Sequence, residues 1–303
     1  MEIDQGIIAL PIDDSEKVKN LKLTFLVENT TYRNMLIAEH GLAVLCEGET
    51  TNGMAFKYLF DTGPSRTGVL NNLNVLKIDL QDLDAIILSH GHYDHTGGLL
   101  SVLGRRFRKK VKIICHPDAL ESKFAKEKNN LRNIGIPFNI ERLTTNDKIN
   151  LITNTEPYYF SKCILTTGQV ERINNFEKVP EKFRTVKKEQ EQKDEILDDQ
   201  ALIFRLNTGL IILAGCSHSG IINIINKAIN ITGIKKVTAI FGGFHLVGAN
   251  IDILQRTIIE LKKFDIDFIG PCHCTGTYAN HLIMGEFLDN FQLVSTGSEF
   301  FYG

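Results

Sequence analysis

The stretch Ser89-His90-Gly91-His92-Tyr93-Asp94-His95-Thr96-Gly97-Gly98 decides the fold, because it holds three of the nine histidines and follows a short apolar run. That run, Ala85–Leu88, is typical of a strand buried on both faces. His90 and His92 alternate along an extended turn, so both side chains can reach one metal ion from the same side. Asp94 and His95 follow where the chain turns, and can reach a second position. Imidazole and carboxylate are ligands that zinc, iron and manganese accept, so the spacing predicts a metal site.

One loop cannot complete two coordination shells, and further candidates follow later strands. The predicted strand 210–214 ends in Gly215-Cys216-Ser217-His218, and the predicted strand 267–270 ends in Pro271-Cys272-His273-Cys274. In α/β proteins ligands bind beyond the carboxyl ends of strands. We therefore expect His218 and His273 to join the first motif.

The order of elements predicts one domain, 1–303, of class α/β (α+β), with two sheets packed together and helices outside. The first hundred residues read mainly as strands, and the last ninety alternate helix and strand. We expect a helix over 117–128 and a final strand near 293–296. The segment 171–199 is dense in Lys and Glu, which predicts an exposed helix or loop that could cover the site as a lid.

Composition excludes several classes of function. The net charge of the 303-residue chain is −2, so we expect neither a nucleic-acid nor a membrane partner. No apolar run approaches the roughly 20 residues of a membrane span, and the acidic stretch 1–14 does not resemble a secretory signal. Six cysteines are too few for a disulfide scaffold, so we expect a cytoplasmic protein.

Three features together resemble the metallo-β-lactamase superfamily. They are the stretch Phe60-Asp61-Thr62-Gly63, the histidine motif, and one histidine after each of two later strands. The resemblance implies a four-layer αβ/βα sandwich with two divalent metal ions at the sheet edge. It assigns His90 and His92 to the first metal ion, and Asp94 and His95 to the second. Asp61 would orient a ligand imidazole, as metal sites require.

Several further motifs are similar to one branch of that superfamily, the dihydropteroate-synthase-like enzymes of archaeal methanopterin biosynthesis. These motifs are Glu39-His40-Gly41-Leu42, Asp198-Asp199-Gln200-Ala201-Leu202, Gly215-Cys216-Ser217-His218, Gly242-Gly243-Phe244-His245-Leu246 and Pro271-Cys272-His273-Cys274-Thr275-Gly276. The branch implies condensation of 7,8-dihydropterin-6-ylmethyl diphosphate with 4-(β-D-ribofuranosyl)aminobenzene 5′-phosphate, releasing pyrophosphate. Zinc is the first expectation for the metal, and iron, manganese or magnesium are alternatives.

The same motifs are compatible with two other functions. A metal-dependent hydrolase of a phosphoester or another small substrate would use the same ligands to activate a water molecule. A metal-binding protein without turnover is the third hypothesis. The small-molecule substrate of either enzyme is expected to carry phosphate.

The sequence departs from the superfamily at two positions. A third ligand of the first metal ion usually follows a Thr-x-Gly segment, but here Thr166-Thr167-Gly168 is followed by Gln169. The usual bridging Asp has no clear equivalent, because the strand end reads Gly215-Cys216. We therefore assign His218 to the first metal ion and His273 to the second, and Cys216 either bridges the two or does not bind.

Four more residues are candidates for roles in binding or catalysis. Asp94 or His245 could transfer a proton, and His245 follows a Gly-Gly pair at a strand end. His40 and Asp199 are candidates for contact with substrate. His116 is expected to cap the following helix and His281 to be structural.

Overall fold

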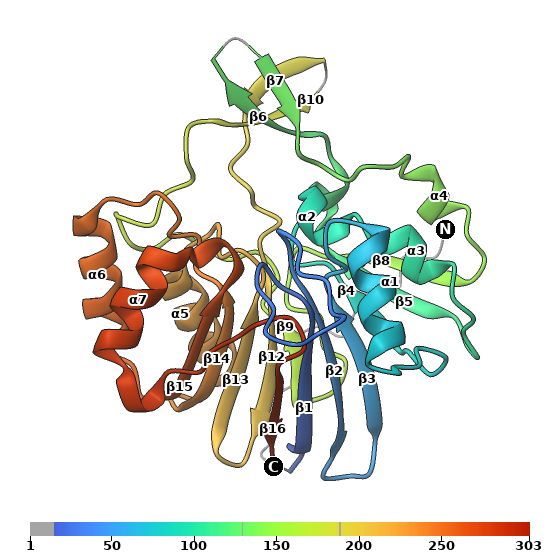
Figure 1. The fold of residues 1–303 in the computed structure, drawn as a ribbon, viewed down its shortest axis with the longest axis horizontal. Coiled ribbons are helices and arrows are strands. Elements are labelled where there is room, and N and C mark those ends of the chain that lie inside the picture. The colour runs from blue at the N-terminus through green and yellow to red at the C-terminus, as the bar shows by residue number, and fades with distance from the viewer. Residues whose placement is uncertain (1–14, 129, 188) are drawn as a thin grey trace.

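The computed structural model describes residues 15–128, 130–187 and 189–303. The prediction made for residues 1–14 therefore lies outside the described residues. Twelve strands of the described chain form one folded sheet, in the order β15-β14-β13-β12-β1-β2-β3-β4-β5-β8, with β16 beside β1 and β9 beside β12 (Figure 1). The sheet bends in the middle, where β1 and β12 pair at Val18 and Leu206, so that its two halves pack against each other.

The N-terminal strands are β1 (Val18–Val27), β2 (Ala43–Thr50), β3 (Ala55–Phe60), β4 (Ala85–Ile87), β5 (Val111–Cys115) and β8 (Ile149–Thr153). The C-terminal strands are β9 (Ile164–Thr166), β12 (Ala201–Leu206), β13 (Gly209–Ala214), β14 (Val237–Gly243), β15 (Ile266–Cys272) and β16 (Glu299–Tyr302). Helices on the N-terminal side are α1 (Arg66–Val75), α2 (Tyr93–Thr96), α3 (Leu99–Leu103) and α4 (Glu141–Thr144). Those on the C-terminal side are α5 (Ile221–Thr232), α6 (Ile251–Leu261) and α7 (Thr277–Glu286). Short 3-10 turns are η1 (Pro117–Leu120), η2 (His273–Thr275) and η3 (Leu288–Asn290).

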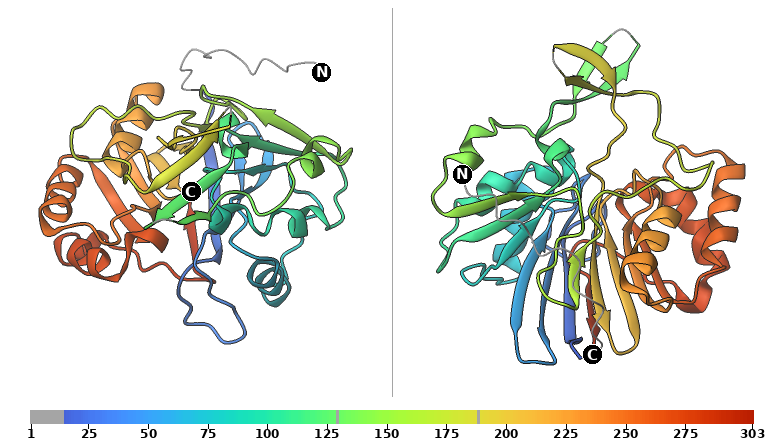
Figure 2. Two further views of the ribbon diagram at one scale, coloured as in Figure 1. Left: turned by 90° about the horizontal axis from the view of Figure 1, so that it is seen from above. Right: turned by 180° about the vertical axis from the view of Figure 1, so that it is seen from behind.

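Three buried clusters mark the contacts between four layers. The central cluster joins the two halves of the sheet and includes Phe25 and Phe241, whose ring centroids lie 5.8 Å apart. A second cluster packs the N-terminal strands against α1 and α3, and a third packs the C-terminal strands against α5, α6 and α7. Figures 1 and 2 show the helices on the outer faces of both halves. The predicted αβ/βα sandwich is confirmed.

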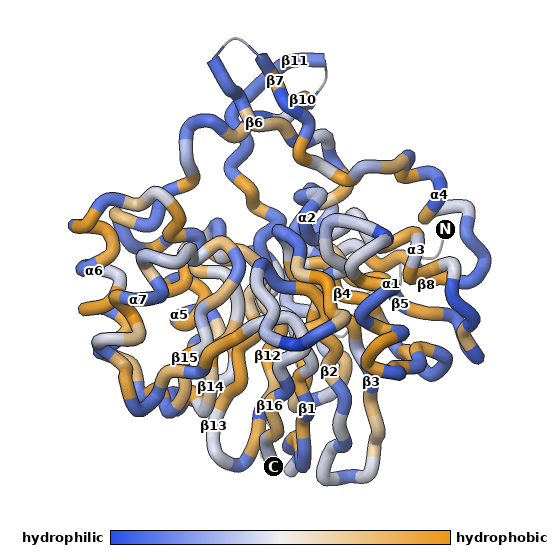
Figure 3. Tube along the Cα trace, in the orientation of Figure 1, coloured by the Kyte–Doolittle hydropathy of each residue, from blue (hydrophilic) through white to orange (hydrophobic). Residues whose placement is uncertain are grey.

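The strand β12 shows how a central strand is buried on both faces. Its side chains alternate between two faces, so Leu202 and Phe204 enter the central cluster while Ala201 and Ile203 face the helices. Both faces are covered, and all six residues of the strand are buried. In the tube of Figure 3, the neighbouring strand β13 is mostly apolar in colour and is also buried along its length.

A second, four-stranded sheet lies above the sandwich and is polar on its surface (Figures 1 and 3). Two hairpins form it, in the order β11-β10-β6-β7. Its strands are β6 (Lys123–Glu127), β7 (Asn130–Asn133), β10 (Phe183–Lys187) and β11 (Gln190–Lys193). We call these two hairpins the cap. A small core of Ala125, Ile134, Val179, Phe183 and Ile196 lies beneath it.

Two predictions of local structure are wrong, and the prediction of a helix or loop over 171–199 is met only in part, by loop. The expected helix over 117–128 is a short turn, η1, followed by strand β6, because Glu121 is extended and Lys123 and Ala125 alternate inward. No helix occurs in the described parts of 171–199, where the alternation of Phe183 and Thr185 makes β10 a strand and the rest is loop and β11. The last strand is Glu299–Tyr302, beside β1, and not 293–296.

Candidate metal centre

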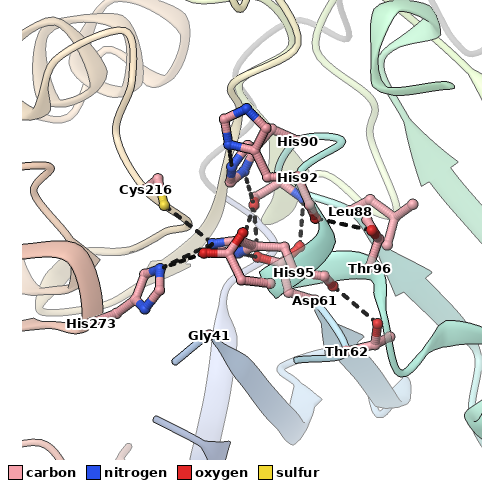
Figure 4. A network of polar contacts seen from close by, with 12 residues as sticks. Gly41, Asp61, Thr62, Leu88, His90, His92, His95, Thr96, Cys216 and His273 are labelled. Atoms are coloured by element: carbon pink, nitrogen blue, oxygen red, sulfur yellow. Dashed lines mark hydrogen bonds and ion pairs between the residues drawn. The ribbon is translucent and has the colours of Figure 1, made fainter. Parts of the chain in front are cut away.

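The fold brings the predicted ligands to one edge because neighbouring strands run parallel there. β3 and β4 are parallel, as are β13, β14 and β15. Asp61 follows β3, the histidine motif follows β4, and the segments with Cys216 and His273 follow β13 and β15. The carboxyl ends of parallel strands meet at one edge, so these side chains converge (Figure 4).

The first cluster is formed by three imidazoles. His90 Nε2 lies 3.0 Å from His92 Nδ1, and His218 Nε2 lies 3.2 Å from each of them. A tetrahedral ion with bonds of about 2.0–2.1 Å separates its ligands by about 3.3 Å, so the nitrogens fit the corners of such a site. Burial lowers the pKa of His92 to about 3, with a nearby Lys123 charge acting in the same direction. Burial, with the neighbouring histidines, also lowers the pKa values of His90 and His218. Neutral rings offer lone pairs, and these donors suit a divalent ion.

The second cluster combines four different groups. His95 Nε2 lies 3.1 Å from Cys216 Sγ and 3.2 Å from His273 Nε2. Asp94 Oδ2 lies 3.5 Å from His273 Nε2 and 3.8 Å from His95 Nε2. All four donor atoms lie within 4.8 Å of one another and all four residues are buried. Two nitrogens, one carboxylate and one sulfur form a donor set that zinc or iron accepts.

The charges around the second cluster favour the ionised forms of Asp94 and His95, but not of Cys216. Burial raises the pKa of Asp94, but the neighbouring His95 charge and a hydrogen bond from His273 outweigh it and hold that pKa below its ordinary value. Burial lowers the pKa of His95, but the charges of Asp61 and Asp94 raise it to about 9. Burial raises the pKa of the Cys216 thiol. In the absence of an ion, the cluster therefore balances one imidazolium against carboxylates.

A layer of hydrogen bonds orients the ligands. Asp61 Oδ2 lies 2.6 Å from His95 Nδ1, and accepts a hydrogen bond from Ser89 Oγ, also at 2.6 Å. Ser89 Oγ lies 2.9 Å from His90 Nδ1, so one carboxylate influences a ring in each cluster. The outward nitrogen of each ring is fixed, which directs its Nε2 to the centre. Asp61 therefore contacts the His95 ring on the side away from the second cluster, where a ligand-orienting residue would lie.

Sequence reasoning missed the residues that hold His273. Its Nδ1 lies 2.9 Å from Asn29 Oδ1, and its backbone N–H donates to Glu28 Oε1 at 2.9 Å. Glu28 and Asn29 directly follow β1, so two polar residues at a strand end were the signal that could have identified them.

Four residues of the site have left-handed backbone conformations that side chains rarely adopt. Their φ angles are 57° at Asp61, 58° at Ser217, 49° at His245 and 49° at His273. Such strain persists only where surrounding contacts enforce it, and it gathers at functional sites.

Three other predicted residues lie around the clusters. His245 stacks near His218, with ring centroids 4.3 Å apart, and burial together with the Lys182 charge lowers its pKa to about 4. His40 is exposed at the rim, and its Nε2 lies 3.6 Å from Asp94 Oδ2. Asp199 is buried and accepts a hydrogen bond from the Ser219 backbone N–H at 2.9 Å, so it supports the His218 loop instead of facing the opening.

Gln169 lies outside both clusters. Its Oε1 is 3.3 Å from His116 Nε2, while His116 Nδ1 accepts a hydrogen bond from the Asp118 backbone N–H. His116 therefore caps the turn η1, as expected, although a longer helix does not follow. His281 is exposed on α7, where its Nδ1 lies 2.9 Å from the Thr277 carbonyl oxygen.

A buried ion cluster connects the cap to the histidine motif. Lys123 of β6 donates to Asp198 Oδ1 at 2.8 Å and to Asp194 Oδ2 at 3.1 Å. Asp198 Oδ2 accepts a hydrogen bond from the Gly91 backbone N–H at 2.7 Å, between the two first ligands. A side chain at Gly91 would collide with the Ala119 backbone, so the loop needs glycine there. Neither Lys123 nor Asp194 was singled out from the sequence.

Comparison with known proteins defines the class. The model of the beta-lactamase superfamily domain matches residues 57–157. A solved structure described as Tm1679, a metal-dependent hydrolase of the beta-lactamase superfamily, aligns with a TM-score of 0.77 and 26% identity. The alignment covers 92% of this chain and 98% of that one. The fold is thus that of a superfamily that includes metal-dependent enzymes.

The sequence relatives are more specific. The chain is 35% identical to the 7,8-dihydropterin-6-methyl-4-(beta-D-ribofuranosyl)-aminobenzene-5′-phosphate synthase of Methanocaldococcus jannaschii, over 93% of this chain and 96% of the relative. An uncharacterized protein of the same archaeon is 36% identical, over 84% of this chain and 90% of its own length. The chain belongs to the beta-lactamase superfamily, in the family that includes this synthase. In the described residues, no helix is long and apolar enough to cross a membrane.

Proposed function

We propose that the protein is a two-metal enzyme that joins a dihydropterin-methyl diphosphate to 4-(β-D-ribofuranosyl)aminobenzene 5′-phosphate and releases pyrophosphate. The observation that carries the proposal is the pair of adjacent clusters, His90–His92–His218 and Asp94–His95–Cys216–His273. Similarity over 93% of the chain to a synthase named for the joined product supports the substrate pair.

We assign the first metal ion to His90, His92 and His218, and the second to Asp94, His95, His273 and Cys216. Bound divalent ions would neutralise the charge of a diphosphate leaving group. Cys216 contributes a soft sulfur donor, which favours zinc or iron over magnesium or manganese. Zinc is our first assignment.

The chain's own residues position the reactants and take up a proton. The amine nitrogen forms a bond to the exocyclic methylene as the carbon–oxygen bond to diphosphate breaks. His245 lies beside His218 and is neutral, so its free ring nitrogen can accept the amine proton. Asp94, ionised at the mouth of the second cluster, is the other candidate for this role. His40 at the rim would contact substrate, whereas Asp199 would hold the His218 loop.

We assign the role of a lid to the charged segment 171–199, together with the β6–β7 hairpin to which it pairs. Phe183 of this segment lies over the first cluster, with its ring centroid 5.5 Å from those of His92 and His218. A closed lid would exclude water, and so would favour transfer to the amine over hydrolysis.

The cysteines support a reducing compartment. All six are free and buried. Buried thiols without disulfide partners are typical of cytoplasmic proteins, and we propose this location.

A hydrolase is the second candidate function, favoured by the likeness to the metal-dependent hydrolase structure. The test is pyrophosphate release from 7,8-dihydropterin-6-ylmethyl diphosphate by zinc-loaded protein, with and without the arylamine phosphate. We expect release that requires the arylamine. Equal release in both mixtures would identify a hydrolase, and absence of release in both would reject the pterin substrate.

A further inference from the structure

A cavity of about 270 Å³ opens beside the first cluster. His218 and His245 form one side of it, the segment 176–182 forms another, and the loop after β14 and helix α6 complete it. Larger hollows of about 640 and 470 Å³ surround Arg105, but neither is lined by a member of the two ligand clusters. Of these three cavities, only the one beside His218 is lined by a member of the ligand clusters.

Two lysines at this cavity are exposed and have no acidic partner within the described residues. Lys178 and Lys182 both line it. Lysines on the cap behave differently, since Lys126 pairs with Glu191, Lys187 with Asp118 and Lys193 with Glu181. The Lys182 ammonium lies 5.3 Å from the centroid of the Phe183 ring, which itself covers the first cluster. Uncompensated positive charge beside the site suits a phosphorylated ligand.

The remaining walls of the cavity are mainly apolar, with Glu177, Ser217 and Thr257 as polar members. The Glu177 carboxylate accepts hydrogen bonds from the Ile222 and Asn223 backbone N–H groups. Phe176, Phe244, Leu246 and Ile253 line the cavity. Val247 is 69% exposed at its edge, which is a high exposure for an apolar side chain. Apolar walls with a few polar groups at one side are typical of sites for small aromatic ligands.

We propose that this cavity binds the phosphorylated arylamine, with its benzene ring against the apolar walls and its phosphate at Lys178 and Lys182. The amine then lies on the side of His218 and His245, where the bond forms. The diphosphate of the pterin occupies the ligand clusters, so the two substrates have separate anion sites. This inference rests on the proposed function and names which residues select the second substrate.

Calorimetric titration of the zinc-loaded full chain tests the inference. The ligands are 4-(β-D-ribofuranosyl)aminobenzene 5′-phosphate and its dephosphorylated form. The variants are Lys178→Gln/Lys182→Gln, Val247→Asp, and the control Lys126→Gln, an exposed cap lysine outside the cavity. All the substituted side chains are exposed, so folding is not at risk.

We expect the double lysine variant to bind the phosphorylated ligand about 10- to 100-fold more weakly and the dephosphorylated ligand unchanged. Val247→Asp should weaken the binding of both ligands, and Lys126→Gln should leave the binding of both unchanged. Wild-type affinity of the double variant for the phosphorylated ligand, or no binding to the wild-type protein at millimolar concentration, would overturn the inference.

Turnover separates this inference from the proposed function. If pyrophosphate release requires the arylamine but its KM is unchanged in the double variant, the synthase stands and the cavity assignment falls. If the wild-type protein shows no such release while binding depends on phosphate and the two lysines as expected, the cavity assignment stands and the synthase falls.

Discussion

Asp61 and His95 form a fully buried pair in which the carboxylate Oδ2 lies 2.6 Å from the imidazole Nδ1. The opposite nitrogen of the same ring lies 3.1 Å from Cys216 Sγ and 3.2 Å from His273 Nε2. Asp61 is thereby placed to orient the His95 ring, with its Nε2 on the side of the second cluster.

Asp61→Asn should weaken binding of the second metal ion about 10- to 100-fold and reduce activity comparably. The amide cannot accept hydrogen bonds from His95 and Ser89 with the strength of a carboxylate. Competition with a chelator, monitored by metal content, measures the change. Asp82→Asn is the control, because Asp82 pairs with Arg108 on the surface. Unchanged affinity in Asp61→Asn would contradict the assigned role.

Binding of the Cys216 sulfur to the metal ion should be visible in the absorption spectrum. With cobalt in place of zinc, a thiolate ligand gives a charge-transfer band in the near ultraviolet. We expect this band in the wild-type protein and its loss in Cys216→Ser. Cys274→Ser should keep it, because Cys274 is not a member of the second cluster and its Sγ donates to the Cys216 carbonyl oxygen at 3.4 Å. A band that survives Cys216→Ser would show that the sulfur does not bind.

Lys123→Met should destabilise the protein by about 3–5 kcal/mol, since it leaves Asp194 and Asp198 buried without their cation. Urea denaturation measures the free energy of unfolding. Lys126→Met, three residues further along β6 and exposed, should change it by less than about 0.5 kcal/mol. A small effect at Lys123 would show that the ion cluster does not hold the cap.

The stability lost in Lys123→Met should depend on pH, with a sign that follows from the pKa shifts of the ion cluster. Burial raises the pKa of Asp198, but Lys123 outweighs it and holds that pKa below its ordinary value. The carboxylate therefore contributes stability above its unfolded pKa of about 4, and loses it as the pH falls through the folded value. Burial lowers the pKa of Lys123, but both aspartates raise it, so its contribution persists to above pH 10. Without Lys123, burial alone acts on both aspartates and raises their pKa values in the variant. The difference between wild type and Lys123→Met should therefore be largest at neutral pH and shrink as the pH falls below about 7, where the variant's carboxylates take up protons. A difference that grows below that pH would contradict the assignment.

The candidate ligands that lie close together in the chain could be predicted from the local sequence. His90, His92, Asp94 and His95 share one turn after a buried strand, so their convergence follows from spacing. His218 and His273 follow from the rule that parallel strands end at one edge. The grouping of His218 with His90 and His92, and of His273 with Asp94 and His95, agrees with the geometry of the clusters.

Contacts between distant segments could not be predicted in this way. Lys123 and Asp198 are 75 residues apart and meet because two hairpins pair into the cap. The same pairing turned the expected helix over 117–128 into a strand, since tertiary contacts override local propensity. Asn29 supports His273 across 244 residues, and its place after β1 marks a polar strand end without indicating which residue it contacts.

The central claim, two metal ions in adjacent sites, is tested most directly by titrating metal-free protein with zinc while following arylamine-dependent pyrophosphate release. We predict that activity rises to a plateau at two zinc ions per chain. In His92→Ala the bound zinc should fall to one ion per chain and activity should be lost, whereas His281→Ala, at an exposed histidine, should match the wild type. A plateau at one ion, or activity without any, would contradict the account.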